Sequence, residues 1–225
     1  MIKTFLKTYG TRLIVPLYMI FYLTAFGFLE DRGMYRMNVI HLSIDYSIPF
    51  CEYFIVPYIL WFFFISFAVF WFMFINKNEK EYLQLILNLM IGMTIFLFIS
   101  WIYPNGHLLR PMTFPRDNVF TDLVRILYKV DTSTNILPSI HAYNSVAVCI
   151  AIMRCQALKN RSVIKSGTVV ITMLIVLATL FLKQHTIIDV ILALVFNFIF
   201  YVVIYAIDDH RVLMKNQVTA RSGHI

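Results

Sequence analysis

The chain has 225 residues, of which 60% are hydrophobic and only 14% are charged. Soluble domains hold about 45–50% apolar and about 25% charged residues, so this composition excludes an ordinary water-soluble domain and indicates one membrane domain over residues 1–225. The net charge of +7 does not indicate a nucleic-acid-binding protein, because most basic residues lie in short segments between apolar runs, where membrane orientation explains them.

A helix needs about 20 mainly apolar residues to cross the hydrocarbon core of a bilayer. Six runs come near this length, so the expected fold is an all-α integral membrane protein, a bundle of six transmembrane helices. The predicted spans are residues 13–29, 54–75, 82–103, 140–157, 167–182 and 186–207. The first span follows a basic start but lacks a small-residue cleavage site, so we expect it to be an uncleaved span rather than a signal peptide.

Two connecting segments are long. Residues 30–53 mix polar and apolar side chains, and we expect them to lie along the membrane interface as a short amphipathic piece. Residues 104–139 carry many charges and lead directly into the fourth span. Residues 211–225 are expected to form a loose polar tail on the cytoplasmic side. The three cysteines have no metal-site spacing and are interpreted as small apolar residues.

The basic residues predict how the spans are oriented. If the N-terminus is cytoplasmic, the cytoplasmic segments hold twelve basic and four acidic residues, a net charge of 12 − 4 = +8. The other side then holds seven basic and eight acidic residues, a net charge of −1. This asymmetry follows the positive-inside rule, so both termini are predicted to be cytoplasmic.

Ionisable groups at membrane depth are costly and tend to mark functional sites, and three groups of them fall on the predicted outer face. His185 and Asp189 stand four residues apart at the start of the last span, a spacing that puts them on one face of a helix. The carboxylate can then fix the tautomer of the imidazole and leave its other nitrogen free to attack an electrophile. Lys183, two residues earlier, could meet an anionic group.

The second and third groups add to this candidate site. Ser139 is a favoured N-cap residue at the start of the fourth span, where backbone N–H groups and the helix dipole attract an anion. His141 is placed to protonate a leaving oxygen as a general acid. Arg110 can bind two phosphate oxygens and neutralise charge in the transition state. The three groups together predict a phosphoryl-transfer site.

Other interpretations remain open for these residues. The His185–Asp189 pair could join two helices, Ser139 could be a plain helix cap, and Arg110 could reach the lipid head groups. A zinc ion held by both histidines and the aspartate is a rival reading, although the cations of Arg110 and Lys183 would repel it. We predict neither a metal nor a cofactor. Three further cations fit contact with lipid head groups better than Arg110 does, namely Arg116, Arg125 and Lys129. No role is assigned to the histidines His41, His107, His210 and His224.

The order Arg-Pro, Pro-Ser-x-His and His-x-x-x-Asp resembles the type 2 phosphatidic acid phosphatase (PAP2) superfamily of membrane enzymes. The resemblance covers residues 110 to 189 in detail. It implies that His185 is the nucleophile and forms a phosphohistidine, that Asp189 orients it, and that His141 protonates the leaving group. Arg110 and Ser139 would then bind the phosphate.

The chain departs from the usual family motifs at several positions. Tyr103 replaces a lysine of the first motif, Ile140 replaces a glycine of the second, and Ala178 and Thr179 replace a Ser-Arg pair before the third. Lys183 could supply the missing cation. The pattern from Asp131 onward looks more like the inositol phosphorylceramide synthase-like branch, which includes phosphotransferases as well as phosphatases.

The expected function is therefore hydrolysis of a lipid phosphate or diphosphate through a phosphohistidine at the non-cytoplasmic face of the cell membrane. The expected partners are the bilayer and a substrate such as phosphatidate, phosphatidylglycerol phosphate or polyprenyl diphosphate. Two alternatives remain, a lipid head-group phosphotransferase with an alcohol acceptor and a non-catalytic lipid-binding or transport protein. The sequence does not predict the oligomeric state.

Overall fold

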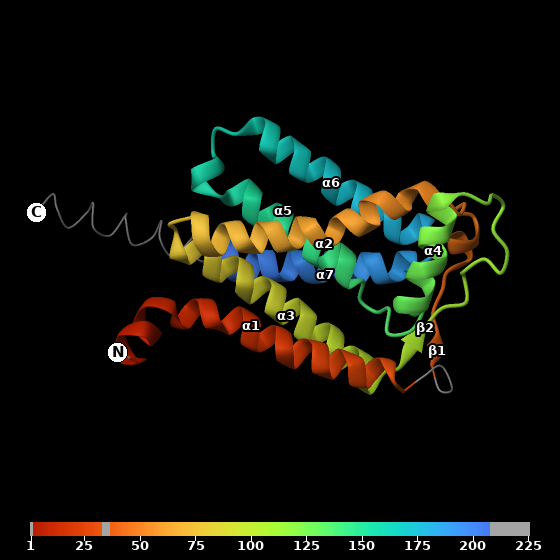
Figure 1. The fold of residues 1–225 in the computed structure, drawn as a ribbon, viewed down its shortest axis with the longest axis horizontal. Helices are drawn as coiled ribbons and strands as arrows, with labels where there is room; N and C mark the ends of the chain where they lie inside the picture. The colour runs from red at the N-terminus through yellow and green to blue at the C-terminus, as the bar shows by residue number, and fades with distance from the viewer. Residues whose placement is uncertain (1, 33–36, 208–225) are drawn as a thin grey trace, which may run out of the picture.

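A computed structural model describes residues 2–32 and 37–207 of this chain. These residues form a bundle of helices with almost no sheet, which confirms the predicted all-α class. Figure 1 shows the long helices lying side by side along the long axis of the molecule. The predicted tail at residues 211–225, together with His210 and His224, lies outside the described residues.

Each of the long apolar runs forms a helix, although α1 begins eleven residues and α6 five residues before the predicted spans. They are α1 (Ile2–Glu30), α2 (Ile55–Phe70), α3 (Glu79–Ile102), α6 (Ser162–Phe181) and α7 (Ile187–Tyr201). Single π-helical turns extend α2 and α7, as η4 (Trp71–Ile75) and η6 (Val202–Ala206). Within the described part of the chain, these five stretches are long and apolar enough to cross a membrane. The sixth predicted span, α5 (Ile140–Arg154), is apolar but shorter, so the count of six stays a prediction.

Helix α5 lies at the centre of the bundle and packs against α2, α3, α6 and α7. It carries buried alanines along with polar residues, which lets neighbouring backbones approach closely. The Tyr143 hydroxyl donates to Asn88 Oδ1 of α3 at 2.6 Å, and the Asn197 amide of α7 donates to the Tyr143 carbonyl at 3.1 Å. These hydrogen bonds join three helices around α5.

Gly92 of α3 gives the Tyr143 ring its space, and this predicts a selective loss of stability. A Cβ atom on Gly92 would lie 1.9 Å from Tyr143 Cε1, and the ring is held by its bond to Asn88. We expect Gly92→Ala to cost about 1–3 kcal/mol. Gly167→Ala, where nothing lies within 4 Å of the new Cβ, is the matched control. Thermal unfolding in detergent measures both, and equal melting temperatures would contradict this account of the packing.

Short elements gather at one end of the bundle. Two-residue strands β1 (Asn38–Val39) and β2 (Asn105–Gly106) pair in parallel and tie the segment after α1 to the segment after α3. The 3-10 helices η2 (Ser43–Tyr46) and η3 (Glu52–Phe54) lead into α2. The helix α4 (Val119–Val130) crosses this end of the bundle (Figure 1).

The expected position of residues 30–53 along the membrane interface stays a prediction. The described part of that segment contains only the strand β1 and the two short 3-10 helices. The amphipathic helix is α4, which buries Thr121 and Val124 and exposes apolar side chains at a helical spacing. Asn118 begins α4 by accepting hydrogen bonds from two backbone N–H groups of its first turn.

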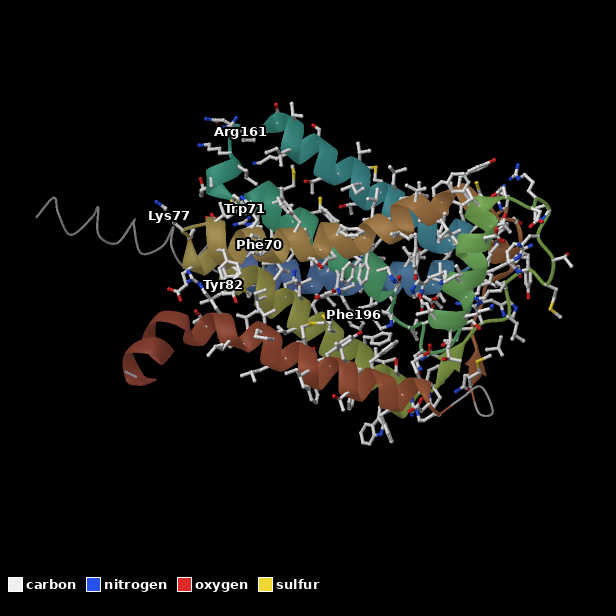
Figure 2. All side chains as sticks on the ribbon, in the orientation of Figure 1. Phe70, Trp71, Lys77, Tyr82, Arg161 and Phe196 are labelled. Carbon is white, nitrogen blue, oxygen red and sulfur yellow. The ribbon has the colours of Figure 1, made fainter. Side chains whose placement is uncertain are left out.

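The opposite end of the bundle carries basic side chains. Lys77 and Arg161 lie there, away from α4 (Figure 2). A 3-10 turn, η5 (Gln156–Leu158), connects α5 to α6 at this end. The connection from α5 to α6 and the candidate site thus lie at opposite ends of the bundle, and the orientation of these ends in a membrane stays a prediction.

Candidate active site

The site is built on the tight turn between α6 and α7. The carbonyl of Thr179 in the last turn of α6 accepts from the N–H groups of both Gln184 and His185, at 2.9 and 3.0 Å. Lys183 adopts a left-handed backbone conformation with φ 52°, which reverses the chain. Thr186 then caps α7, so His185 stands just outside the helix. The turn fixes the His185 main chain from both sides.

Asp189 is held by the helix cap and faces His185. Its Oδ2 accepts from the N–H of Thr186 at 2.8 Å, and its own N–H donates to Thr186 Oγ1 at 3.4 Å, which completes a capping box. The same Oδ2 lies 3.4 Å from His185 Nδ1. His185 and Asp189 are therefore close together, as predicted. Their contact does not arise from two positions on one helix, because His185 precedes the helix and the Asp189 side chain folds back towards the N-cap of α7.

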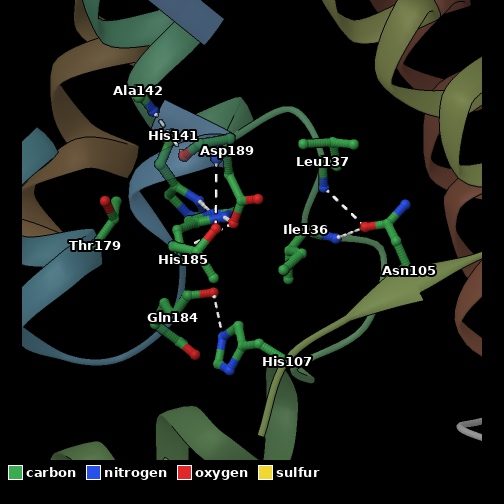
Figure 3. Close-up of polar contacts among 12 residues, drawn as sticks. Asn105, His107, Ile136, Leu137, His141, Ala142, Thr179, Gln184, His185 and Asp189 are labelled. Atoms are coloured by element: carbon green, nitrogen blue, oxygen red, sulfur yellow. Dashed lines mark hydrogen bonds and ion pairs between the residues drawn. The ribbon is translucent and has the colours of Figure 1, made fainter. Parts of the chain in front are cut away.

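His141 completes a chain of three side chains. Its Nδ1 lies 3.4 Å from His185 Nε2, on the ring edge away from Asp189 (Figure 3). If His185 carries its proton on Nδ1, facing the carboxylate, then Nε2 presents its lone pair and His141 Nδ1 carries the other proton. This assignment gives a nucleophilic nitrogen and a proton donor that face each other. A phosphorus atom would have to enter between them.

This chain-like arrangement differs from a metal site. Asp189 and His141 approach opposite edges of the His185 ring, so the three groups do not converge on one point. Among the residues that the structure describes, no three His, Cys, Asp or Glu side chains are grouped to hold a metal ion. The residues present do not fit the tetrahedral zinc ligation that was the rival reading.

Two aromatic rings of α2 hold His141. The ring centroids of Tyr58 and Trp61 lie 4.6 and 4.3 Å from that of His141. The Tyr58 hydroxyl makes a short hydrogen bond to Asp131 Oδ2, and the Gln184 amide donates to the same oxygen at 3.3 Å. The sequence did not reveal Tyr58 and Trp61 as site residues, because α2 reads as uniformly apolar. It gave Asp131 and Gln184 no role in the site, because neither has a partner at helical spacing.

Arg110 is anchored beside the turn. Its Nη atoms donate to the carbonyls of Tyr128 and Asp131 at 3.2 and 2.6 Å, and one makes a short bond to Gln184 Oε1. The guanidinium also lies over the Tyr128 ring, 4.3 Å from its centroid. Burial lowers the pKa of Arg110, yet the group stays charged near neutral pH. Its buried Nε has no partner among the described residues, so its N–H is a donor that an anion could use. Phosphate binding by Arg110 stays a prediction.

Lys183 points elsewhere. Its buried ammonium donates to the carbonyls of Asp45 and Ile48 at 2.7 and 2.5 Å, and burial lowers its pKa. The Asp45 carboxylate meanwhile accepts from the N–H of Ile187, the first residue of α7, at 2.9 Å. In this arrangement Lys183 joins the segment before α2 to the turn, and its predicted role as a phosphate ligand stays untested.

Ser139 is the N-cap of α5, as predicted. Its hydroxyl oxygen accepts from the N–H of Ala142 at 3.3 Å, and its side chain is fully buried. Its own N–H donates to the Asp189 carbonyl at 3.1 Å, which ties the start of α5 to α7. Asn105 braces the preceding loop by accepting from the N–H groups of Ile136 and Leu137 (Figure 3). The phosphate-binding role of Ser139 stays a prediction.

His107 is a site residue that the sequence did not reveal. It is fully buried, its Nδ1 accepts from the N–H of Leu109 at 3.2 Å, and its Nε2 lies 3.0 Å from the Gln184 carbonyl (Figure 3). These contacts require a neutral ring with the proton on Nε2. Burial lowers the pKa of His107 to about 4, which agrees with that state. His107 thus fixes the main chain directly before His185.

The lowered pKa of His107 predicts acid sensitivity. The unfolded chain, with a histidine pKa near 6.5, takes up a proton before the folded chain does, so stability is full above pH 6.5 and falls towards pH 4. We expect a loss of roughly 2 kcal/mol from this group between pH 7 and pH 5. His107→Phe should flatten the pH dependence of the melting temperature, and His41→Phe, in an exposed loop, should preserve it. If His107→Phe and His41→Phe both show the same dependence of melting temperature on pH as the wild type, then His107 is not the source of the acid sensitivity.

A family comparison supports the resemblance drawn from the motifs. Residues 109–212 match the model of the PAP2 superfamily, and this stretch includes Arg110, Ser139, His141, His185 and Asp189. The predicted resemblance is confirmed, and it supports a membrane enzyme of the phosphatase type that acts on a lipid phosphate. The narrower likeness to the inositol phosphorylceramide synthase-like branch stays a prediction. No curated protein and no solved structure matches this chain.

Proposed function

We propose that this chain, whose residues 109–212 match the PAP2 superfamily, is a membrane lipid phosphatase that works through a phosphohistidine on His185. The observation that carries the proposal is the chain of contacts from Asp189 through His185 to His141. In this arrangement His185 Nε2 is the oriented nucleophile and His141 Nδ1 is the proton donor, and the two atoms face each other. Both roles are needed to displace a poor leaving group from phosphorus.

The first step is attack of His185 Nε2 on phosphorus. The bond from phosphorus to the leaving oxygen breaks, and that oxygen takes a proton from Nδ1 of His141, which acts as the doubly protonated imidazolium and is left as the neutral imidazole. Asp189 stabilises the positive charge that develops on the His185 ring. The 3.4 Å between the two histidines is too short to hold a phosphoryl group, so the rings separate when substrate binds. Arg110 Nε and the start of α5 at Ser139 then meet the phosphoryl oxygens.

The second step releases the phosphate. His141, now lacking its proton, accepts one from water, and the water oxygen attacks phosphorus as the bond to His185 Nε2 breaks. An alcohol entering in place of water would make the same site a phosphotransferase. The charge asymmetry of the connecting segments supports an outward-facing site with cytoplasmic termini, in line with the positive-inside rule.

Phosphate release from a panel of lipid phosphates by the purified protein tests this function. Phosphatidate, phosphatidylglycerol phosphate and a polyprenyl diphosphate are offered with EDTA present, with and without an alcohol acceptor. We expect phosphate release that EDTA leaves unchanged. If product forms only when alcohol is added, then the protein is a phosphotransferase and not a phosphatase. If EDTA abolishes activity, then a metal ion such as zinc is required.

A further inference from the structure

Helix α4 carries two different rows of side chains on its exposed surface. One row, called here the apolar stripe, has positions four, three and four residues apart, a spacing that places them along one side of a helix. Its side chains are 36–79% exposed. The second row is charged. The apolar stripe consists of Val119, Leu123, Ile126 and Val130, and the charged row of Asp122, Arg125 and Lys129. An exposed apolar surface of this kind marks a contact with a membrane or a partner.

The charged row faces the end of the molecule. The Arg125 Nη1 atom donates to Asp117 Oδ1 at 2.8 Å, and the guanidinium lies 5.3 Å from the centre of the Phe114 ring. Both partners belong to the segment before α4, which reaches beyond this helix at the end of the bundle (Figure 1). The apolar stripe lies roughly 100° further around the helix, on the other flank of the buried face. It therefore faces back along the bundle.

The surface beside the apolar stripe is the one that lipid would cover. Helix α4 runs across the long helices, so it lies in the plane of a membrane that those helices span (Figure 1). It packs against α2, whose side chains Val56, Ile59 and Leu60 are apolar and 41–46% exposed. The stripe thus continues the apolar outside of α2. A helix in this plane, with an apolar flank towards hydrocarbon and a charged flank towards water, has the geometry of an interfacial helix.

The end of α4 also holds two parts of the candidate site. Arg110 donates to the carbonyl of Tyr128, in the last turn, and to that of Asp131, the C-cap residue. The Tyr128 hydroxyl donates to the Leu182 carbonyl at 2.7 Å, three residues before His185. A shift of α4 against the bundle would therefore displace Arg110 and the turn that carries His185.

We propose that α4 is a membrane-interface helix that inserts its apolar stripe between head groups and hydrocarbon beside α2, and that this contact keeps the site in place. The membrane contact goes beyond the proposed function, and its effect on the site rests on that function. The partner is a lipid surface of any head-group charge. Asp122 and Asp117 balance the cations Arg125 and Lys129, so anionic lipid is not needed.

Spin labels report which medium surrounds each row. A nitroxide is attached at Leu123→Cys in the stripe or at Lys129→Cys in the charged row, after Cys51, Cys149 and Cys155 are replaced by alanine, and the protein is placed in phosphatidylcholine vesicles. We expect oxygen, which concentrates in hydrocarbon, to reach the label at 123 more often than a water-soluble nickel chelate does, and the reverse at 129. Added phosphatidylglycerol should change neither. A label at 123 reached mainly by nickel, or shielded from both reagents by a protein partner or a second copy, would overturn the membrane contact.

Two variants with the same change in charge test the effect on the site. Ile126→Glu combined with Val130→Glu places two negative charges in the stripe, and Lys129→Glu changes the net charge by the same amount in the charged row. We expect the double variant to lose the oxygen preference at 123 and to release phosphate about tenfold more slowly in vesicles, because the site loses its alignment. Lys129→Glu should keep both properties. All three side chains are exposed, so both variants should keep the wild-type melting temperature in detergent.

The outcomes separate the two parts of the proposal. If the label at 123 leaves lipid in the double variant and phosphate release stays at the wild-type rate, then α4 binds the membrane without controlling the site. If Lys129→Glu lowers phosphate release as much as the double variant, then added charge and not the stripe is responsible, which overturns the coupling. Absence of phosphate release by the wild-type protein would contradict the proposed function, while the label at 123 would still decide the membrane contact.

Discussion

Replacement of His185 by alanine is expected to lower phosphate release by at least roughly 10³-fold, because no other side chain can form the covalent bond to phosphorus in the proposed mechanism. The imidazole is 7% exposed and makes its close polar contacts with His141 and Asp189. A radiolabelled lipid phosphate should label the wild-type protein in a rapid acid-free quench and leave the variant unlabelled. The alkali-stable, acid-labile character of the bond identifies a phosphohistidine.

His41→Ala is the matched control for this experiment. His41 lies in an exposed loop and contacts only the Tyr46 ring among the partners that the structure describes. We expect it to keep wild-type rates and labelling. Phosphate release that persists in His185→Ala, with the same melting temperature as wild type, would show that another group is the nucleophile.

Replacement of Asp189 by asparagine should lower kcat by about 10²- to 10⁴-fold, as expected when the group that orients a catalytic histidine loses its charge. The amide oxygen can still accept from the N–H of Thr186, so the helix cap is preserved. The same amide oxygen faces His185 Nδ1 but carries no negative charge, so it stabilises the imidazolium that forms during attack far less than the carboxylate does. We expect phosphoenzyme formation in a single turnover to slow by the same factor.

Thr186→Val separates orientation from capping. It removes the hydroxyl that accepts from the N–H of Asp189 at 3.4 Å, while the carboxylate stays in place. Loss of this cap should cost about 1 kcal/mol of stability and leave kcat near the wild-type value. Asp189→Asn and Thr186→Val are compared for both kcat and melting temperature. If each variant loses activity in proportion to its loss of stability, then Asp189 acts only as part of the helix cap.

The features that the sequence predicted well depend on neighbouring residues. Apolar runs set the bounds of α1, α3 and α6 to within a few residues at their ends nearer the candidate site, and Ser139 marks where α5 begins. The spacing of His185 and Asp189 identified their contact, although the contact arises because Thr186 starts the helix after His185. A side chain in the first turn of a helix, such as Asp189, can contact the residue four positions earlier even when that residue lies before the N-cap.

The features that the sequence did not predict depend on distant contacts. Lys183 bonds to carbonyls more than 130 residues away, and His107 is defined by the main chain of Gln184, 77 residues away. Local spacing carries no signal for such pairs. Helix α4 was hidden for another reason, because its 12 residues are too short for a span and lie within a charged connecting segment.

The central position of α5 has a consequence for how the protein is made. This helix is short, carries Asn144, Ser145 and His141, and buries most of its surface against other helices. A segment of that kind enters lipid poorly by itself, since its polar groups find partners only on its neighbours. We therefore expect stable insertion of α5 to await the synthesis of α6 and α7. The proton donor and the nucleophile would then meet only at the end of biogenesis, and truncated chains would be inactive.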